Sequence, residues 1–202
     1  FVGASAGLQR GRVGFEVGGA MSWHDGRTIR ALEFGGLKER AAGEFDASSW
    51  QIFSEARVDL FNGPVRVQPF AGLTHQQTQI DGFSEAGGAA ALTVGEREQD
   101  VTLSKLGLRL NGAVAAWGGT VAPKIEIGWQ HGWGELDGYS QARFSTGNGF
   151  LFQGARVAED AAELEFGLEW RAGAFKLGAT FNGFVSDVWS EHGATVSAGF
   201  SF

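Results

Sequence analysis

Acidic and basic side chains recur at every second position in several stretches of this 202-residue sequence. Glu163, Glu165 and Glu169 form the densest set of acids, and in an extended strand their side chains share one face. Neighbouring carboxylates raise one another's pKa, which is what an acid–base centre needs. Pairing with lysine or arginine across the same surface is the alternative, since it keeps the carboxylates ionised. Ion pairing is the interpretation we favour.

Histidine offers the remaining titratable chemistry, at His24, His75, His131 and His192. A metal site needs such side chains to converge with suitable spacing, whereas the strand pattern described below places all four at or beyond one set of strand ends. The motifs G-x-S-x-G and H-E-x-x-H, which would suggest a hydrolase, do not occur in the sequence. We therefore predict no catalytic site, no metal site and no cofactor.

Strands must position these charges, because apolar and polar residues alternate with a period of two. Residues 194–202 are the clearest case, with Val196, Ala198 and Phe200 on one face and small or polar residues on the other. The pattern predicts an all-β chain. The predicted strands are residues 2–9, 13–23, 50–60, 65–74, 100–110, 121–131, 163–171, 175–182 and 194–202.

The apolar faces of these strands carry no Asp, Glu, Lys or Arg. A soluble sandwich or a lipocalin-like barrel would also alternate, with its apolar face turned inward. Acids and bases stand together on the opposite faces, however, and a wet lumen tolerates that mixture. We therefore predict an antiparallel up-and-down transmembrane β-barrel. The predicted lumen-facing residues are Glu55, Arg57, Arg66, Lys105, Arg109, Lys124, Glu126, Glu165, Glu169, Arg171 and Lys176, and Glu16, Asp59 and Glu163 lie on the same faces.

Tryptophan and glycine add two further expectations. Interfacial aromatic belts are predicted to include Trp23, Trp129, Trp133, Trp170 and Trp189. Glycines on the lumen faces either leave room for a polypeptide or let a small barrel bend, and both interpretations stay open. These glycines are Gly14, Gly18, Gly72, Gly107, Gly128, Gly167 and Gly178.

The links between strands alternate in length, as short periplasmic turns and long outer loops do in outer-membrane barrels. Short links follow Leu8 and Leu60, for example. On this rule residues 24–48 leave and return on one side, so they form a hairpin-like extension and nine crossings remain. Single-chain bacterial barrels have an even number of strands. Either a tenth strand lies in residues 27–42 or strands precede Phe1, and we favour the second.

Composition and charge exclude several classes of protein. The net charge of -7, without a cluster of lysine or arginine, argues against a nucleic-acid partner. No stretch is apolar for long enough to be a transmembrane helix, and the start Phe1-Val2-Gly3 is not a signal peptide. The absence of cysteine fits a protein that crosses an oxidising periplasm. We expect one domain, residues 1–202.

Most of the chain resembles the β-barrel translocator domain of autotransporters, which are secreted by the type V route. The resemblance is strongest over residues 64–112 and extends to the C-terminus. The stretches that carry it are VQPFAGL at Val67–Leu73, IDGFSEAGG at Ile80–Gly88, LSKLGLRL at Leu103–Leu110, Trp129–His131 and Gly199–Phe202.

This resemblance implies a twelve-stranded barrel, of which the chain would hold strands four to twelve, with a helix running through the pore to a secreted passenger. It also implies a place in the cell outer membrane, with membrane lipid and lipopolysaccharide, the barrel assembly machinery and the chain's own passenger as partners. Gly199, Phe200 and Phe202 are similar to the family's C-terminal assembly signal. Neither helix nor passenger is visible, so export is implied for the parent protein.

Two rival functions stay open beside export. One is a barrel enzyme, a lipase or protease, that acts on lipid or peptides at the outer rim. The other is a passive pore or an adhesin whose long loops bind. Some members of the family cut their own passenger with lumen acids, and Glu126, Glu165 and Glu169 are the candidates for that role here.

Overall fold

The computed structural model describes residues 1–201, which form two antiparallel sheets. No helix in this part of the chain is long and apolar enough to cross a membrane. The strands are β1 (Val2–Arg10), β2 (Val13–Phe34), β3 (Leu37–Val58), β4 (Phe61–Asn62), β5 (Val65–Ile80), β6 (Phe83–Ser84), β7 (Leu92–Val94), β8 (Arg97–Gly112), β9 (Val114–Ala116), β10 (Gly119–Gly134), β11 (Tyr139–Phe144), β12 (Phe150–Gln153), β13 (Asp160–Ala172), β14 (Phe175–Ser186) and β15 (Ser190–Phe200).

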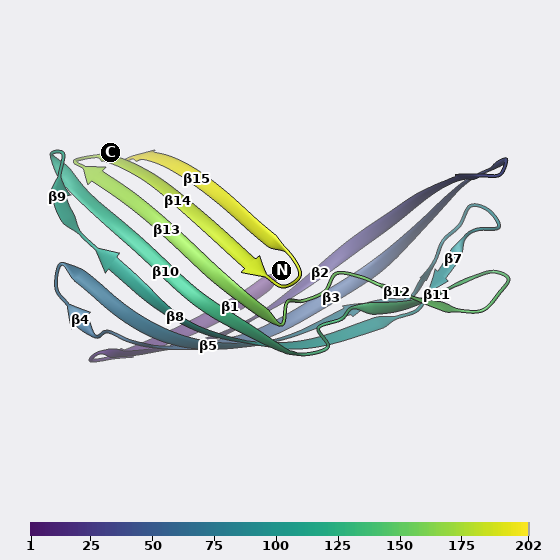
Figure 1. Ribbon diagram of the computed structural model, residues 1–202, viewed down its shortest axis with the longest axis horizontal. Helices are drawn as coiled ribbons and strands as arrows, with labels where there is room; N and C mark the ends of the chain where they lie inside the picture. The colour runs from purple at the N-terminus through teal and green to yellow at the C-terminus, as the bar shows by residue number, and fades with distance from the viewer. Residues whose placement is uncertain (202) are drawn as a thin grey trace.

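The large sheet has an up-and-down topology. Its strands pair in the order β1-β2-β3-β5-β8-β10-β13-β14-β15, so each long strand lies beside the next one along the chain. Figure 1 shows the sheet curling over, with β13 to β15 (green to yellow) above and β2 and β3 (purple) behind. The all-β, antiparallel, barrel-like prediction is confirmed. Among residues 1–201, the outer edges of β1 and β15 have no strand partner in this sheet.

Residues 13–58 form a single long hairpin, which includes the region between the second and third predicted strands. β2 and β3 pair without interruption from Val13 with Val58 to Phe34 with Leu37. Residues 27–42 are therefore the outer half of this hairpin and not another crossing, as the link lengths predicted. Figure 1 shows the hairpin tip reaching far beyond the ends of β13 to β15.

Two other long links also contain strands that the sequence pattern did not predict. Residues 81–96 contain β6 and β7, and residues 135–159 contain β11 and β12. These strands form the small sheet, in the order β12-β11-β7-β6. The small sheet lies at the same end of the molecule as the hairpin tip (Figure 1).

Pro69 lies inside β5, which is continuous through it. Pro69 pairs with Leu108 of β8, whereas the ladder to β3 has already ended at the pair Arg57–Phe70. Proline has no N–H group to donate to a neighbouring strand. Pro69 is tolerated because it lies just beyond the end of the ladder between β5 and β3.

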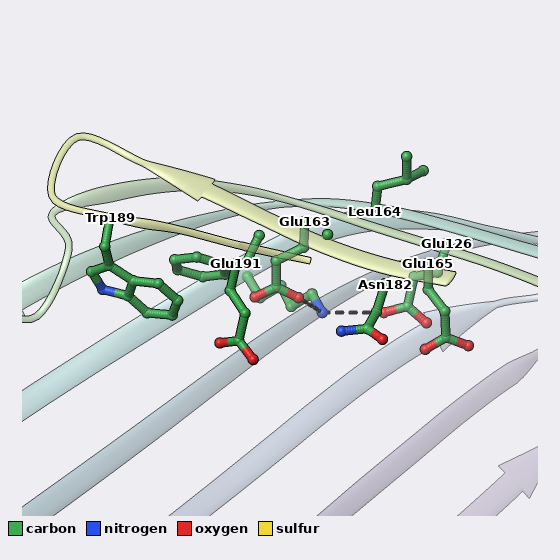
Figure 2. A pocket seen from close by; sticks show the side chains of 10 residues that line it. Glu126, Glu163, Leu164, Glu165, Asn182, Trp189 and Glu191 are labelled. Atoms are coloured by element: carbon green, nitrogen blue, oxygen red, sulfur yellow. Dashed lines mark hydrogen bonds and ion pairs between the residues drawn. The ribbon is translucent and has the colours of Figure 1, made fainter. Parts of the chain in front are cut away.

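The two faces of the large sheet differ as the alternation predicted. Leu164 and Phe200 are 42% and 60% exposed, and Phe166 and Phe175 are also exposed. Figure 2 shows Leu164 pointing away from the hollow of the sheet, whereas Glu163 and Glu165 beside it point into that hollow. The apolar side chains therefore cover the convex face, and the charged ones lie on the concave face.

Aromatic rings cover some of the concave-face glycines. The Phe70 ring occupies the space that a Cβ atom on Gly107 would need, and the Phe53 ring does the same at Gly18. Phe70 is only 5% exposed. At these two positions the missing side chain makes room for a neighbouring ring, which is a use of glycine that neither sequence-based interpretation included.

Candidate functional site

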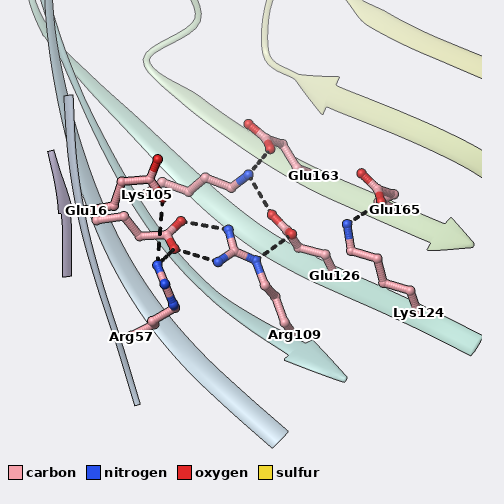
Figure 3. A network of polar contacts seen from close by, with 9 residues as sticks. Glu16, Arg57, Lys105, Arg109, Lys124, Glu126, Glu163 and Glu165 are labelled. Atoms are coloured by element: carbon pink, nitrogen blue, oxygen red, sulfur yellow. Dashed lines mark hydrogen bonds and ion pairs between the residues drawn. The ribbon is translucent and has the colours of Figure 1, made fainter. Parts of the chain in front are cut away.

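The concave face carries a continuous chain of ion pairs between residues of five strands of the large sheet, β2, β3, β8, β10 and β13 (Figure 3). Acids and bases alternate along it, as expected for charges that face a wet space and offset one another. In order from β2 to β13, its members are Glu16, Arg57, Glu55, Arg109, Glu126, Lys105 and Glu163. This chain of ion pairs spans most of the width of the sheet, so it links strands that do not pair directly.

Arg109 is the centre of this chain. Its two terminal nitrogens donate to the two carboxylate oxygens of Glu55, over 2.6 Å and 2.7 Å. Its Nε donates to Glu126 Oε2 over 2.8 Å. The Glu126 side chain is 13% exposed. Bidentate arginine–carboxylate contacts of this kind are directional and strong, so they fix the separation of β3, β8 and β10.

Lys105 and Phe70 complete the centre. The Lys105 ammonium donates to Glu126 over 3.1 Å and also contacts Glu163. The guanidinium carbon of Arg109 lies 3.9 Å from the centre of the Phe70 ring, and the Lys105 nitrogen lies 5.6 Å from it. Both cations therefore lie over one aromatic face from β5, the strand that contributes no charge to the chain.

The other predicted lumen residues form separate groups. Lys124 pairs with Glu165 over 2.7 Å. Glu169 pairs with both Arg171 and Lys176, each over 2.5 Å.

Arg66 makes no ion pair within residues 1–201, and it lines a cavity of about 560 Å³ together with Arg57 and Asp59. The predicted residues thus share the concave face, but only Glu55, Arg57, Lys105, Arg109 and Glu126 join the central chain.

A second cavity, of about 250 Å³, opens on the concave face beside this chain (Figure 2). Its lining includes Lys105, Glu163, Phe184, Trp189 and Glu191. The ring of Trp189 stacks on that of Phe184, with centroids 4.4 Å apart and an interplanar angle of 20°. The interpretation of Trp189 as an interfacial belt residue is therefore wrong, because its side chain turns into the cavity.

The acids considered for acid–base chemistry are all held by cations. Glu163 contacts Lys105, Glu165 contacts Lys124, and Glu169 contacts Arg171 and Lys176. This arrangement is the ion-paired alternative of the sequence analysis.

The histidines do not gather at one point. His131 Nδ1 lies 3.0 Å from Asp160 Oδ1, and ligand atoms of His131, Asp160 and Glu159 lie within 4.8 Å of one another. His24 contacts Ser22, and His75 contacts Thr102. The expectation that the chain holds no metal stays a prediction.

Beyond the barrel part, residues 83–92, called the strap, lie against the long hairpin. Arg30 donates to both carboxylate oxygens of Glu85, over 3.0 Å and 2.5 Å, and also to the Ala90 carbonyl over 2.8 Å. The Leu92 N–H donates to Glu85 over 3.0 Å. The Glu85 side chain is 3% exposed. The hydrogen bonds from Arg30 hold the pKa of Glu85 below its ordinary value.

Three further residues of the strap, Phe83, Ala86 and Gly87, lie against β3. The Phe83 ring stacks on Phe45, with centroids 5.3 Å apart. Ala86 exchanges two backbone hydrogen bonds with Ala42, over 2.9 Å and 2.8 Å. Gly87 has a positive φ of 120° and lies so close to the Arg40 carbonyl that a side chain would not fit. The stretch IDGFSEAGG therefore ties a loop to the hairpin.

Comparison with known families agrees with this geometry. Residues 1–182 match the family described as "Autotransporter beta-domain". The chain belongs to the autotransporter β-domain family. Two curated relatives, each named "Extracellular serine protease" and from Serratia marcescens, are 32% and 31% identical over 160 residues. In both cases the match covers 79% of this chain but only 15% of the relative.

Two of the three residues of the proposed assembly signal in this autotransporter β-domain, Gly199 and Phe200, belong to the part of the chain that the structure describes. Phe200 lies edge-on to Phe175, with ring centroids 5.1 Å apart, and Gly199 pairs with Lys176. Phe202 lies outside the described residues. The role of these residues in assembly stays a prediction.

Sequence reasoning missed Phe70, Glu191 and the Arg30–Glu85 pair as parts of the charged surfaces. Phe70 is apolar, so the search for charges passed over it. Arg30 and Glu85 stand in regions without clear alternation, and no local signal pairs residues that lie so far apart in the sequence.

Proposed function

We propose that this chain is the outer-membrane part of an autotransporter that provides the passage for an N-terminal passenger polypeptide. The observation that carries the proposal is the sidedness of the sheet, with exposed apolar side chains on the convex face and the ion-pair chain on the concave face. Lipid suits the first face and water the second. Family membership supports the same role.

The proposal includes a closed barrel. Backbone groups at a free strand edge have no partner in hydrocarbon, so β1 and β15 need further pairing. We propose that other strands of the parent protein supply it, in agreement with the small share of the relatives that the chain covers. Lipid, the assembly machinery and the passenger would then be its partners. Residues 1–202 would act as a conduit and not as a catalyst.

An exported reporter tests this function. An epitope-tagged reporter replaces the passenger in the parent protein, and intact cells are treated with protease. We expect the reporter to be degraded while a periplasmic marker survives. A reporter that stays protected, although the barrel resists denaturation by detergent before heating, would contradict the proposal.

A further inference from the structure

The cavity beside the central ion-pair chain combines acidic side chains with a stacked aromatic pair. Glu163 of β13, Phe184 of β14 and Glu191 of β15 stand in register across the three strands. Trp189 lies against Phe184. Figure 2 shows Trp189, Glu163 and Glu191 pointing into the same hollow. The wall thus presents two carboxylates on either side of an aromatic surface.

The charges of this cavity are not balanced. Glu126 is paired with Arg109 and Lys105, Glu163 with Lys105, and Glu165 with Lys124. Glu191 makes no ion pair with any residue in the range 1–201. Among the described residues, one carboxylate therefore has no cation, next to the aromatic pair. The described side chains leave room there for one positive charge.

The size of the cavity is enough for one long side chain. Its volume of about 250 Å³ lies below the range of about 300–1,000 Å³ that is usual for small-molecule pockets. Guanidinium and ammonium groups are attracted to aromatic faces and form charge-assisted hydrogen bonds with carboxylates. The cavity offers both contacts at once. Arginine gains more than lysine, because its planar group can stack on Trp189 while it donates to Glu191.

We propose that this cavity is a binding subsite for a single cationic side chain, arginine above lysine, of the polypeptide that occupies the pore. The inference rests on the proposed function, since it needs a polypeptide on the concave face. Glu191 supplies the charge, and Trp189 and Phe184 supply the stacking surface. Glu163, held by Lys105, lies on the other side of the aromatic pair on the same wall.

The subsite would slow a passing chain at basic residues. An unfolded polypeptide moves through a wet pore with few specific contacts, so one carboxylate with an aromatic surface gives a measurable dwell time.

Blockade of single-channel current tests the subsite. The complete β-domain of the parent protein is inserted in a planar bilayer, and an oligoarginine peptide or an oligoglutamate peptide of equal length is added. We expect oligoarginine to block the current in long events and oligoglutamate to give none. Glu191→Gln and Trp189→Ala should each shorten the oligoarginine dwell time about tenfold, a loss of about 1.4 kcal/mol.

Asp187→Asn is the matched control. It removes one negative charge from the turn between β14 and β15, but Asp187 does not line the cavity. The dwell time should stay within a factor of two. Resistance to detergent before heating shows that each variant has folded.

The outcomes separate this inference from the function on which it rests. Normal conductance without oligoarginine block, or equal losses in Asp187→Asn and Glu191→Gln, would overturn the subsite and leave the export function standing. A folded barrel that conducts no current would overturn both.

Discussion

The guanidinium carbon of Arg109 lies 3.9 Å from the centre of the Phe70 ring, so a cation on β8 rests on an aromatic side chain from β5. The same ring fills the space above Gly107, two residues before Arg109 on β8. One side chain therefore serves both strand packing and the ion-pair chain. This coupling makes the centre of the concave face sensitive to small changes in side-chain volume or charge.

Gly107→Ala should lower the free energy of unfolding by about 1–3 kcal/mol, the usual cost of forcing an extra methyl group into a packed site. The new Cβ would meet the Phe70 ring and would lie 2.6 Å from the Ile127 carbonyl oxygen. Denaturant titration of the barrel in lipid vesicles measures the change. Gly72→Ala is the control on the same face, because its nearest neighbour, the Ser54 carbonyl oxygen, would lie 3.4 Å away. Equal losses in both variants would contradict the account.

Arg109→Met should cost about 2–4 kcal/mol of unfolding free energy, because Glu55 and Glu126 would both lose a charged partner in a half-buried place. The same titration measures it. Arg156→Met is the control, since Arg156 pairs with Asp137 where both side chains are exposed. Such exposed pairs contribute about 0–1 kcal/mol. A cost for Arg109→Met as small as that of the control would show that the central chain contributes little to stability.

The strap should loosen in acid. The pKa of Glu85 is lowered from 4.5 by its hydrogen bonds to Arg30, so the folded state binds this proton less readily than the unfolded state does. The contact then stabilises the strap fully above the unfolded pKa, and the stabilisation is lost as the pH falls through the lower folded pKa. Amide hydrogen exchange of residues 83–92 should show constant protection above a pH of about 4.5 and decreasing protection below it.

Glu85→Gln should remove this pH dependence and reduce protection at neutral pH. Glu33→Gln should leave the profile unchanged, because Glu33 pairs with Lys38 at a place where both side chains are exposed. If Glu85→Gln kept the acid-dependent loosening, other groups would have to control the strap.

Assembly of the barrel should depend on the C-terminal aromatic contact. Phe200→Ala removes the ring that lies against Phe175, with centroids 5.1 Å apart, and shortens the apolar convex face at the last described strand. We expect less folded barrel in the outer membrane, by about two- to tenfold, as measured by the detergent-resistant band before heating. Val196→Ala, an exposed change on the same strand, should have a smaller effect. Equal amounts in both variants would argue against a specific role for Phe200.

Alternation predicted the nine long strands of the large sheet, but not the short β4 and β9, and it predicted the side of the sheet on which most charges lie. Glu126 and Lys105 were placed on one face by period two alone, because neighbouring side chains in a strand point to opposite faces. Link lengths separated the hairpin extension from a further crossing. Such regularities follow from local geometry and from the difference between lipid and water.

Contacts between distant parts of the chain could not be predicted in this way. Glu85 is paired with Arg30 by the fold of a loop, and Trp189 turns inward because Phe184 offers it a stacking surface. A ring that fills the place of a glycine side chain, as at Gly107, depends on the register between strands. The register depends on pairing across the whole sheet, so it cannot be inferred from the sequence of one segment.

We propose that lipid covers the convex face and water fills the concave one, and two adjacent residues on β13 test this sidedness most directly. The natural chain has no cysteine, so Leu164→Cys and Glu165→Cys each give one site for a fluorescent label. In vesicles with brominated lipid and soluble iodide, the label at position 164 should be quenched by the lipid and the label at position 165 by iodide. The reverse pattern, or quenching of both labels by iodide alone, would contradict the account.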